Sequence, residues 1–335
     1  MHASMNNGEP ILATKDLRMY FPVKGGIFRR AVAACKAVDG VSLTIQPGET
    51  LGLVGESGCG KSTFGKTIAR LYEPTGGSVK FEGNELAGLS RSQLKPFRRE
   101  IQMIFQDPYE SLNPRHTVSA IIEEPFVIHN MGTRAERRQW VAELLDKVGL
   151  HESAAQRFPF EFSGGQRQRI GIARALALKP RLLICDEPVS ALDVSIQSQI
   201  LNLLMELQRD LDLSYLFISH DLAVVKHISD RIAIMYLGKI VELGDSKEIY
   251  KNPRHPYTKA LLSAIPVPDP THVPDRQILE GDVPSPIDPP PGCAFAPRCP
   301  VKASAECETR MPELVEVEPG YWLSDCPCCE AKKPQ

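Results

Sequence analysis

The feature that most constrains this chain is a glycine-rich octapeptide that follows a short apolar run. The run Thr50–Val54 leads into Gly-Glu-Ser-Gly-Cys-Gly-Lys-Ser at positions 55–62, and a helical pattern follows. Glycines at this spacing let successive backbone N–H groups point at one set of phosphate oxygens without Cβ clashes. The N-terminus of the following helix adds its positive dipole end. The order strand, loop, helix therefore predicts a phosphate-binding loop rather than a chance glycine-rich turn.

A loop of this kind surrounds a nucleotide triphosphate with backbone and side-chain donors. We expect Lys61 to reach the β- and γ-phosphates and the Ser62 hydroxyl to hold Mg²⁺. The residues expected to contact the nucleotide are Gly55, Glu56, Ser57, Gly58, Cys59, Gly60, Lys61, Ser62 and Thr63.

A second apolar run, Leu182–Asp186, ends in two acidic residues. The run predicts a buried strand whose carboxyl end carries Asp186, where a carboxylate can hold Mg²⁺ or its water. Glu187 follows directly and is positioned to polarise the water that attacks the γ-phosphate, as a general base. An exposed acidic turn would not explain the apolar run before the pair. The loop and the acid pair together predict a nucleotide hydrolase or transferase.

Strand-like runs alternate with helical patterns between residues 11 and 250, which predicts an α/β fold of the P-loop NTPase type. Further strands are expected at Gln102–Phe105, Tyr215–Ser219 and Ile232–Tyr236. The stretch 118–178 has mostly helical spacing of its apolar residues. It predicts a helical subdomain, at about residues 108–178, inserted into the α/β core. Residues 1–10 are expected to be a flexible N-terminus.

Composition and charge disfavour several classes of protein. The net charge is −2, and no basic excess points to a nucleic-acid partner. No run approaches eighteen apolar residues, so no segment is expected to span a bilayer. The polar N-terminus lacks the apolar core of a secretory signal. We therefore expect a cytosolic chain.

The stretch Phe162–Arg169, Phe-Ser-Gly-Gly-Gln-Arg-Gln-Arg, resembles the signature sequence of the ATP-binding cassette (ABC) family, which usually has leucine at the first position. Ser-Gly-Gly alone could be a serine-capped helix start. The resemblance implies instead a second anion-binding nest, which serves the ATP of a facing subunit. The residues implied are Ser163, Gly164, Gly165 and Gln166.

Three further motifs occur in the order that the family has. Gln106, in Ile-Phe-Gln-Asp-Pro, resembles the Q-loop glutamine that ligands Mg²⁺ and senses the γ-phosphate. Ser190–Asp193 resembles the D-loop, which crosses the dimer interface through Asp193, and His220 resembles the switch histidine on the γ-phosphate. The family also stacks an aromatic ring on adenine. Phe21 is the candidate and Tyr20 the runner-up.

The composition changes after Asn252, because thirteen of the 28 prolines lie between Pro253 and Pro300. Such a segment is expected to be extended or turn-rich. Asn252–Thr258, the proline-rich tail and the early stretch Phe21–Arg30 resemble the dipeptide, oligopeptide and nickel importer branch. The similarity is greatest to the second (F-type) ATPase of dipeptide permeases. It implies a nucleotide-binding domain at residues 11–250 and a C-terminal extension at residues 251–335.

The resemblance also implies an activity and partners. The activity is ATP hydrolysis that drives uptake of dipeptides or oligopeptides, with nickel, glutathione or another small cargo as alternatives. The implied partners are a second, homologous ATPase in a heterodimer, two transmembrane permease subunits, and indirectly a periplasmic or lipid-anchored binding protein. The chain would lie at the cytoplasmic face of the bacterial inner membrane, with Asp107–Thr117 receiving a helix of a permease subunit.

Two other classes of ABC ATPase are alternatives to a transporter subunit. Soluble ABC ATPases of DNA repair, chromosome maintenance or translation usually carry two cassettes, or coiled coils or zinc modules between Q-loop and signature. Here Gln106 and Ser163 are only 57 positions apart. A regulatory ATPase that drives no transport stays open.

Six of the nine cysteines lie beyond position 290. Disulfides are disfavoured in a reducing cytosol, and metal ligation can fold a segment that lacks its own core. Zinc accepts four thiolates, and the tail contains one zinc-like C-x₂-C pair; free thiols are the remaining alternative. The wide spacings resemble the four-cysteine [4Fe–4S] tail of peptide-permease ATPases. The implied ligands are Cys293, Cys299, Cys307 and Cys326, with Cys328 and Cys329 as alternatives for the fourth.

Overall fold

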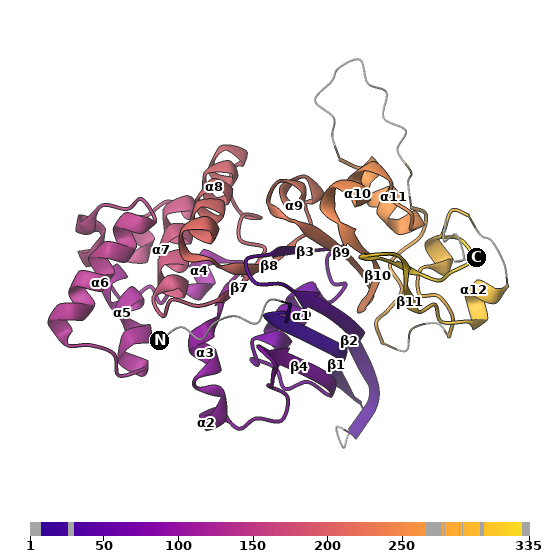
Figure 1. The fold of residues 1–335 in the computed structure, drawn as a ribbon, viewed down its shortest axis with the longest axis horizontal. Coiled ribbons are helices and arrows are strands. Elements are labelled where there is room, and N and C mark those ends of the chain that lie inside the picture. Colours follow the sequence, from indigo (N-terminus) through magenta and orange to yellow (C-terminus); the bar gives the residue numbers. More distant parts are fainter. Residues whose placement is uncertain are drawn as a thin grey trace, which may run out of the picture. The chain divides into compact units, whose positions relative to one another are not determined.

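The computed structural model describes residues 8–25, 30–265, 277, 279–287, 289, 291–301 and 305–329 (Figure 1). Most of the expected flexible N-terminus, residues 26–29 of the early stretch, and several parts of the C-terminal extension lie outside these residues. The chain divides into two compact units. The first takes its residues from 1–44, 50–88 and 219–335, and the second from 45–49 and 89–218.

The first unit contains a four-stranded sheet in the order β2-β1-β4-β5. Strand β1 runs antiparallel to β4, with Leu12 opposite Phe81, and its register shifts after Lys15. At this bulge Asp16 has a φ of +48°, and a Cβ on Gly77 would lie 2.2 Å from the Asp16 carbonyl oxygen. Glycine is therefore required where the two strands approach most closely. The bounds are β1 Leu12–Gly25, β2 Arg30–Ile45, β4 Gly76–Phe81 and β5 Asn84–Glu85.

The first unit also contains five strands in the order β11-β12-β10-β9-β3. Strands β3 and β9 are parallel, whereas β10 pairs antiparallel with both β9 and β12. Strand β12 thus attaches the C-terminal extension to the sheet. The strand bounds are β3 Thr50–Val54, β9 Arg231–Tyr236, β10 Lys239–Asp245, β11 Leu314–Glu318 and β12 Tyr321–Ser324. The helices of this unit are α1 Lys61–Ile68, α9 Leu222–Ile228, α10 Ser246–Lys251, α11 Pro256–Ser263, α12 Glu306–Thr309 and the 3₁₀ turn η3 Ala296–Arg298.

The second unit contains three parallel strands in the order β8-β7-β6 and a group of helices. Helices α5, α6 and α7 pack on one another (Figure 1). Thr117 caps α5 and Thr133 caps α6, each accepting from a backbone N–H of the first turn. The strand bounds are β6 Ile101–Ile104, β7 Leu182–Asp186 and β8 Ser214–Ser219. The helices are α2 Arg91–Leu94, α3 Phe97–Glu100, α4 Pro108–Ser111, α5 Val118–Ile128, α6 Arg134–Lys147, η1 Glu152–Gln156, η2 Pro159–Glu161, α7 Gly164–Leu176 and α8 Val194–Leu211.

The five strands expected from the sequence all occur. Strands β3 and β7 have the expected bounds, while β6, β8 and β9 begin one residue earlier than expected. The helical spacing of 118–178 becomes α5, α6, α7 and two 3₁₀ turns. The hairpin β11–β12 is not expected from the sequence. It follows the proline-rich stretch, and its strand β12 pairs with β10, which lies far earlier in the chain. Among the described residues, no helix is both long and apolar enough to cross a membrane.

Candidate active site

The phosphate loop, residues 55–60, joins β3 to α1 in the first unit. Gly58 and Gly60 have φ values of +79° and +109°, and Gly60 is the N-cap of α1. A Cβ on Gly60 would lie 2.0 Å from the Ala37 carbonyl oxygen, and one on Gly55 would lie 2.2 Å from the Met235 carbonyl oxygen. Side chains at these positions would push the loop away from β2 and β9. The glycines are therefore required both by conformation and by packing.

Lys61 begins α1, and its side chain folds back over the loop. It is 4% exposed, and its Nζ donates to the carbonyl oxygens of Gly55 at 2.7 Å and Glu56 at 2.9 Å. Cys59 lies in the same loop, with its Sγ 3.8 Å from this ammonium. Burial raises the pKa of the Cys59 thiol, against the opposing effect of Lys61. The loop thus holds a buried cation at the start of a helix, as a phosphate site requires.

The acid pair and the Q-loop glutamine lie together in the second unit. Asp186 ends β7 and is 1% exposed, and Glu187 is 8% exposed. Gln106, which follows β6, donates from Nε2 to Glu187 Oε2 at 2.9 Å. The Glu187 N–H donates to the Ile218 carbonyl oxygen at 2.9 Å, and its φ is +47°. Two parallel strands therefore bring the predicted base and the predicted sensor into direct contact at their carboxyl ends.

The signature residues form the start of α7. Ser163 is the N-cap in a capping box, since its hydroxyl accepts from Gln166 N–H while Gln166 Oε1 accepts from Ser163 N–H at 3.0 Å. The serine-capped helix start is thus part of the structure. A Cβ on Gly165 would lie 2.4 Å from Ile196 Cγ2, and one on Gly164 3.2 Å from Leu192 Cδ2. The glycines let the start of α7 pack closely against the D-loop and α8.

The D-loop, Ser190–Asp193, begins three positions after Glu187. The Ser190 hydroxyl donates to the Glu187 carbonyl oxygen at 3.1 Å, and Asp193 is the N-cap of α8. Gln197 reaches back and donates to the carbonyl oxygens of Val189 and Leu192. Val194 at the start of α8 is 78% exposed. The sequence-predicted residues Gln106, Ser163, Glu187 and Asp193 therefore belong to one compact unit.

The remaining nucleotide-site candidates lie in the first unit. His220 follows β8 and is exposed. Phe21, on β1, is half-buried, and its ring packs edge-on against Tyr72 with ring centroids 5.4 Å apart. Tyr20 instead donates its hydroxyl to Asp39, and burial together with this contact raises the pKa of Tyr20 to about 12. Tyr72 was missed from the sequence because nothing local marks it as a partner of Phe21.

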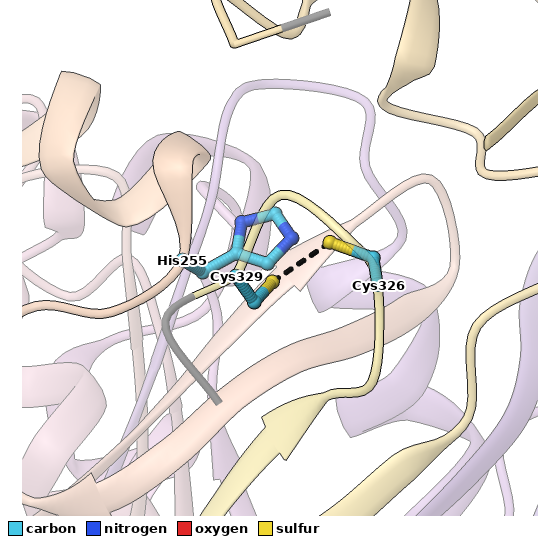
Figure 2. Close-up of side chains that lie close together, drawn as sticks. All are labelled: His255, Cys326 and Cys329. Carbon is cyan, nitrogen blue, oxygen red and sulfur yellow. Dashed lines mark hydrogen bonds between the residues drawn. The ribbon is translucent and has the colours of Figure 1, made fainter. Parts of the chain in front are cut away.

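The C-terminal extension brings two cysteines and a histidine together (Figure 2). Cys326 Sγ lies 2.8 Å from Cys329 Sγ, and the ligand atoms of His255, Cys326 and Cys329 all lie within 4.8 Å of one another. The Cys329 thiol, and then His255, lower the pKa of the Cys326 thiol. His255 Nδ1 accepts from Tyr257 N–H at 3.1 Å, which leaves Nε2 for the sulfurs. The sequence alone does not indicate His255 as a neighbour of the cysteines, although this residue lies within the motif Asn252–Thr258.

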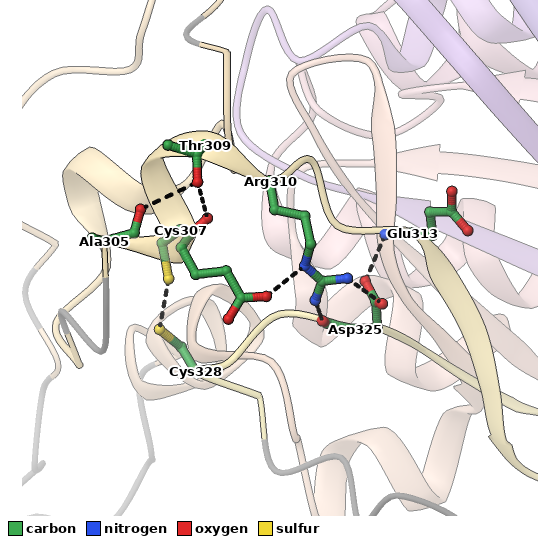
Figure 3. A network of polar contacts seen from close by, with 8 residues as sticks. Ala305, Cys307, Thr309, Arg310, Glu313, Asp325 and Cys328 are labelled. Carbon is green, nitrogen blue, oxygen red and sulfur yellow. Dashed lines mark hydrogen bonds and ion pairs between the residues drawn. The ribbon is translucent and has the colours of Figure 1, made fainter.

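Cys293, Cys307 and Cys328 also make contacts among the tail cysteines. Cys307 Sγ lies 3.7 Å from Cys328 Sγ (Figure 3). Cys293 N–H donates to the Cys307 carbonyl oxygen at 2.7 Å. Burial raises the pKa of the Cys293 thiol to about 11, and the nearby Cys326 and Cys307 contribute to the rise. Each of the two sulfur–sulfur contacts includes one of the alternative candidates for the fourth metal ligand. Cys329 contacts Cys326, and Cys328 contacts Cys307.

Comparisons with known proteins show the family of the chain. Residues 38–190 match the family model of the ABC transporter, and residues 241–307 match that of the oligopeptide/dipeptide transporter C-terminal region. The chain is 56% identical over 321 residues to the oligopeptide transport ATP-binding protein AppF of Bacillus subtilis, covering 95% of this chain and 97% of the relative. It is 54% identical to the oligopeptide transport ATP-binding protein OppF of Escherichia coli, covering 94% and 95%.

The fold is also similar to solved structures. A dimeric, post-hydrolysis structure of the ATP-binding cassette MJ0796 bound to ADP and phosphate matches with a TM-score of 0.63 and 30% identity, covering 70% of this chain and 98% of that chain. The protein cbiO1 of Clostridium perfringens, described as part of the ABC transporter complex cbiONQ, matches with a TM-score of 0.62 and 27% identity, covering 72% of this chain and 91% of that chain. The chain therefore belongs to the ATP-binding cassette ATPases, among the relatives of the oligopeptide transport ATP-binding proteins AppF and OppF.

Proposed function

We propose that this chain is the ATP-hydrolysing subunit of a bacterial importer that takes up peptides across the cytoplasmic membrane. The observation that carries the proposal is the 56% identity, over 95% of the chain, to a protein named for oligopeptide transport. The match to the oligopeptide/dipeptide C-terminal model supports the same class of cargo. Nickel, glutathione or another small cargo remains the alternative, as does a regulatory ATPase that drives no uptake.

The family uses ATP with Mg²⁺. We assign Lys61 to the β- and γ-phosphates, Ser62 and Asp186 to the metal, and His220 to the γ-phosphate. Glu187 is the proposed general base, supported by its hydrogen bond from Gln106. Since this bond holds the carboxylate by its Oε2, Gln106 would also aim the base, besides its proposed role as a metal ligand. The proposed domain limits are 11–250 for the nucleotide-binding domain, with its helical subdomain at 108–178, and 251–335 for the extension.

The proposed assembly is a heterodimer of this chain with a homologous ATPase. Ser163, Gly165 and Asp193 would complete the partner's ATP site, and the partner's signature would complete the site at Lys61. Dimeric cassettes among the similar structures support this arrangement. The heterodimer would dock on two permease subunits at the cytoplasmic face of the membrane, with a substrate-binding protein on the other side.

Docking on a permease subunit is proposed for the stretch Asp107–Thr117. Asp107 caps the short helix α4, and Tyr109 on this helix is 65% exposed. The Arg167 guanidinium lies 3.7 Å from the centre of the Tyr109 ring, which ties this surface to the signature helix α7. A cross-linker at Tyr109 should therefore capture a permease subunit in the assembled transporter, and exclusive capture of other proteins would refute the docking site.

A [4Fe–4S] cluster is proposed for the extension, with Cys293, Cys299, Cys307 and Cys326 as ligands. The fit is supported by the shared backbone hydrogen bond of Cys293 and Cys307 and by the electrostatic influence of Cys326 on Cys293. The contacts of Cys329 and Cys328 keep both open as the fourth ligand. When bound, such a cluster supplies a rigid four-thiolate staple and a redox centre.

Anaerobically purified protein tests the cluster. We expect a brown protein with broad absorbance near ~400 nm, and about four irons and four sulfides per chain. Cys326→Ser, Cys328→Ser and Cys329→Ser, compared side by side, identify the fourth ligand by which of them loses iron. Stoichiometric zinc without iron would show that the extension holds a zinc site and no iron–sulfur cluster.

Two measurements test the transport function: which proteins co-purify with this chain, and which ligand stimulates its ATP hydrolysis. Purified from its native membrane, the chain should be accompanied by two permease subunits and a second ATPase. ATP hydrolysis by this complex should rise when a peptide-loaded binding protein is added, and it should not respond to the unloaded protein. A complex whose ATPase responds to nickel or glutathione and to no peptide would favour the alternative cargo.

A further inference from the structure

Arg298, in the C-terminal extension, forms a two-pronged ion pair with the second residue of the phosphate loop. Its Nη1 donates to Glu56 Oε2 at 2.6 Å and its Nη2 to Glu56 Oε1 at 3.0 Å. The two residues are 242 positions apart in the sequence, and both lie in the first unit. The Arg298 side chain is 8% exposed and that of Glu56 is 28% exposed. Bidentate pairs of this kind fix both position and orientation, and shielding from water strengthens them.

A second contact reaches the same residue. The Tyr257 hydroxyl, on α11, accepts from the Glu56 backbone N–H at 2.9 Å. Tyr257 has no exposed surface. Because the Glu56 carbonyl oxygen also accepts from Lys61 Nζ at 2.9 Å, the N–H, the carbonyl and the carboxylate of Glu56 are all held. Two parts of the extension, the residue Arg298 and the helix α11, thus hold Glu56 in the phosphate loop.

The position of Arg298 is set by a tight turn between two of the proposed cluster ligands. Ala296 N–H donates to the Cys293 carbonyl oxygen at 2.9 Å, Arg298 N–H to that of Phe295 at 2.9 Å, and Cys299 N–H to that of Ala296 at 3.3 Å. These bonds wind the chain from Cys293 to Cys299 into one compact turn. The backbone that carries the Arg298 guanidinium therefore belongs to the same turn as both cysteines.

Aromatic packing fixes this turn to the rest of the first unit. Phe295 is 2% exposed, and its ring packs against Tyr236 at 5.3 Å, Tyr257 at 5.5 Å and His255 at 5.6 Å between ring centres. Tyr257 is the residue that binds the Glu56 N–H, and His255 lies beside Cys326 and Cys329. A continuous set of packed rings therefore runs from the cysteines to the phosphate loop.

The ion pair has an electrostatic consequence for ATP. The Glu56 carboxylate is an anion within the phosphate loop, and it would repel a triphosphate if it were unpaired. Arg298 cancels that charge and holds the carboxylate in one orientation. Loss of Arg298 would leave a partly shielded negative charge in the loop that has to accept the phosphates.

We propose that Arg298 is a positioning residue through which the cysteine-rich extension controls the affinity of the phosphate loop for ATP. The folded turn between Cys293 and Cys299 presents the guanidinium to Glu56 and favours nucleotide binding. Loss of a metal held by Cys293 and Cys299 would loosen this turn, withdraw the guanidinium and weaken binding. The inference rests on the ATPase activity of the chain, and it does not depend on the cargo or on which metal the extension binds.

The full-length chain tests this proposal through its equilibrium affinity for a non-hydrolysable ATP analogue with Mg²⁺. Arg298→Ala should raise the Kd about tenfold, the scale of one unpaired charge near the ligand. The increase should shrink at high salt, because ions screen a partly exposed carboxylate. Adding Glu56→Gln to Arg298→Ala should restore the affinity to within about threefold, because it removes the unpaired charge.

The matched control is Arg310→Ala, in the same extension. Arg310 pairs with Asp325 at 2.8 Å (Figure 3) and with Glu306 at 2.9 Å, and neither partner belongs to the phosphate loop. It should leave the Kd for the ATP analogue unchanged. Circular dichroism of each variant confirms that it folds. An unchanged Kd for folded Arg298→Ala, or an equal rise for Arg310→Ala, would overturn the proposal.

The link to the thiols is tested by non-additivity. Cys299→Ser should raise the Kd in the wild-type chain and should have little further effect in the Arg298→Ala background, since both act through one contact. Cys293→Ser serves as the second variant if Cys299→Ser does not fold. Independent, additive effects of the cysteine and arginine variants would contradict transmission through Arg298. A transporter that takes up no peptide would leave these binding results standing, so the two proposals fail separately.

Discussion

Glu187 is held in a conformation that a glutamate rarely adopts. Its φ of +47° lies in the left-handed region, which costs an ordinary residue about 1–2 kcal/mol. The conformation persists because the Glu187 N–H is bound to the Ile218 carbonyl and its carboxylate accepts from Gln106. Backbone strain held by hydrogen bonds at a strand end is typical of functional residues.

The change Glu187→Gln tests the proposed base. It keeps the shape and a hydrogen-bonding group but removes the proton acceptor, so ATP should still bind while turnover falls by about 10²–10⁴. Steady-state ATP hydrolysis and analogue binding by the assembled transporter measure the two effects. Glu206→Gln, an exposed change on α8, serves as the control and should hydrolyse at the wild-type rate. Wild-type turnover in Glu187→Gln would exclude the assigned role.

The residue pairs that make the site were beyond the reach of the sequence. Spacing and resemblance identified Gln106 and Glu187 separately, yet their contact joins positions 81 apart. Arg298 and Glu56 are 242 positions apart, and the sequence around neither residue indicates the other as its partner. Local motifs are visible because the chemistry needs neighbouring residues. Long-range partners depend on strand order and helix packing, which no short stretch encodes.

Among the elements, α7 shows how close packing requires glycine. Its first turn approaches α8 so closely that a Cβ on Gly165 would lie 2.4 Å from Ile196 Cγ2. Later in the same helix, a Cβ on Gly171 would meet nothing within 4 Å. The two glycines therefore differ in their surroundings although they share one helix.

Gly165→Ala and Gly171→Ala should accordingly have opposite effects on stability. Gly165→Ala should destabilise the chain by about 1–3 kcal/mol through overpacking. Gly171→Ala should stabilise it by roughly 0.5–1 kcal/mol, because alanine loses less backbone entropy in a helix. Chemical denaturation gives both free energies of unfolding.

The companion change Ile196→Ala provides the control for this pair. In its presence Gly165→Ala should cost much less, since the clashing methyl group is gone. The explanation would be wrong if both glycine variants destabilised the chain equally. It would also be wrong if Ile196→Ala did not reduce the destabilisation caused by Gly165→Ala.

The secondary structure was largely predictable, and the tail was not. Buried strands such as Leu182–Asp186 are apolar throughout, and their bounds follow from the run itself. The hairpin β11–β12 has no such fully buried run, because no residue of β11 is buried and two of its five residues are glutamates. The position of His255 beside Cys326 could not be predicted, because a long proline-rich stretch separates the two residues in the sequence. For the same reason the set of metal ligands stays a proposal.

At the scale of the whole molecule, the chain should be half of a functional ATPase. If Ser163 completes a site on a partner, the isolated chain should be mostly monomeric and hydrolyse ATP weakly. The variant Ser163→Arg should keep ATP binding at its own phosphate loop while blocking hydrolysis at the partner's site. Sedimentation and ATP turnover, with and without the second ATPase, measure this. Full turnover by the isolated monomer would contradict the shared site.

The most direct test of the central claim is peptide uptake by vesicles that contain the complete transporter, with ATP supplied on the side of this subunit. Uptake should require ATP, and replacing this chain by its Glu187→Gln variant should reduce it by about 10²–10⁴, in parallel with the loss of hydrolysis. Wild-type peptide uptake with the Glu187→Gln subunit, or hydrolysis without any uptake, would contradict the assignment of this chain as the ATPase that drives peptide import.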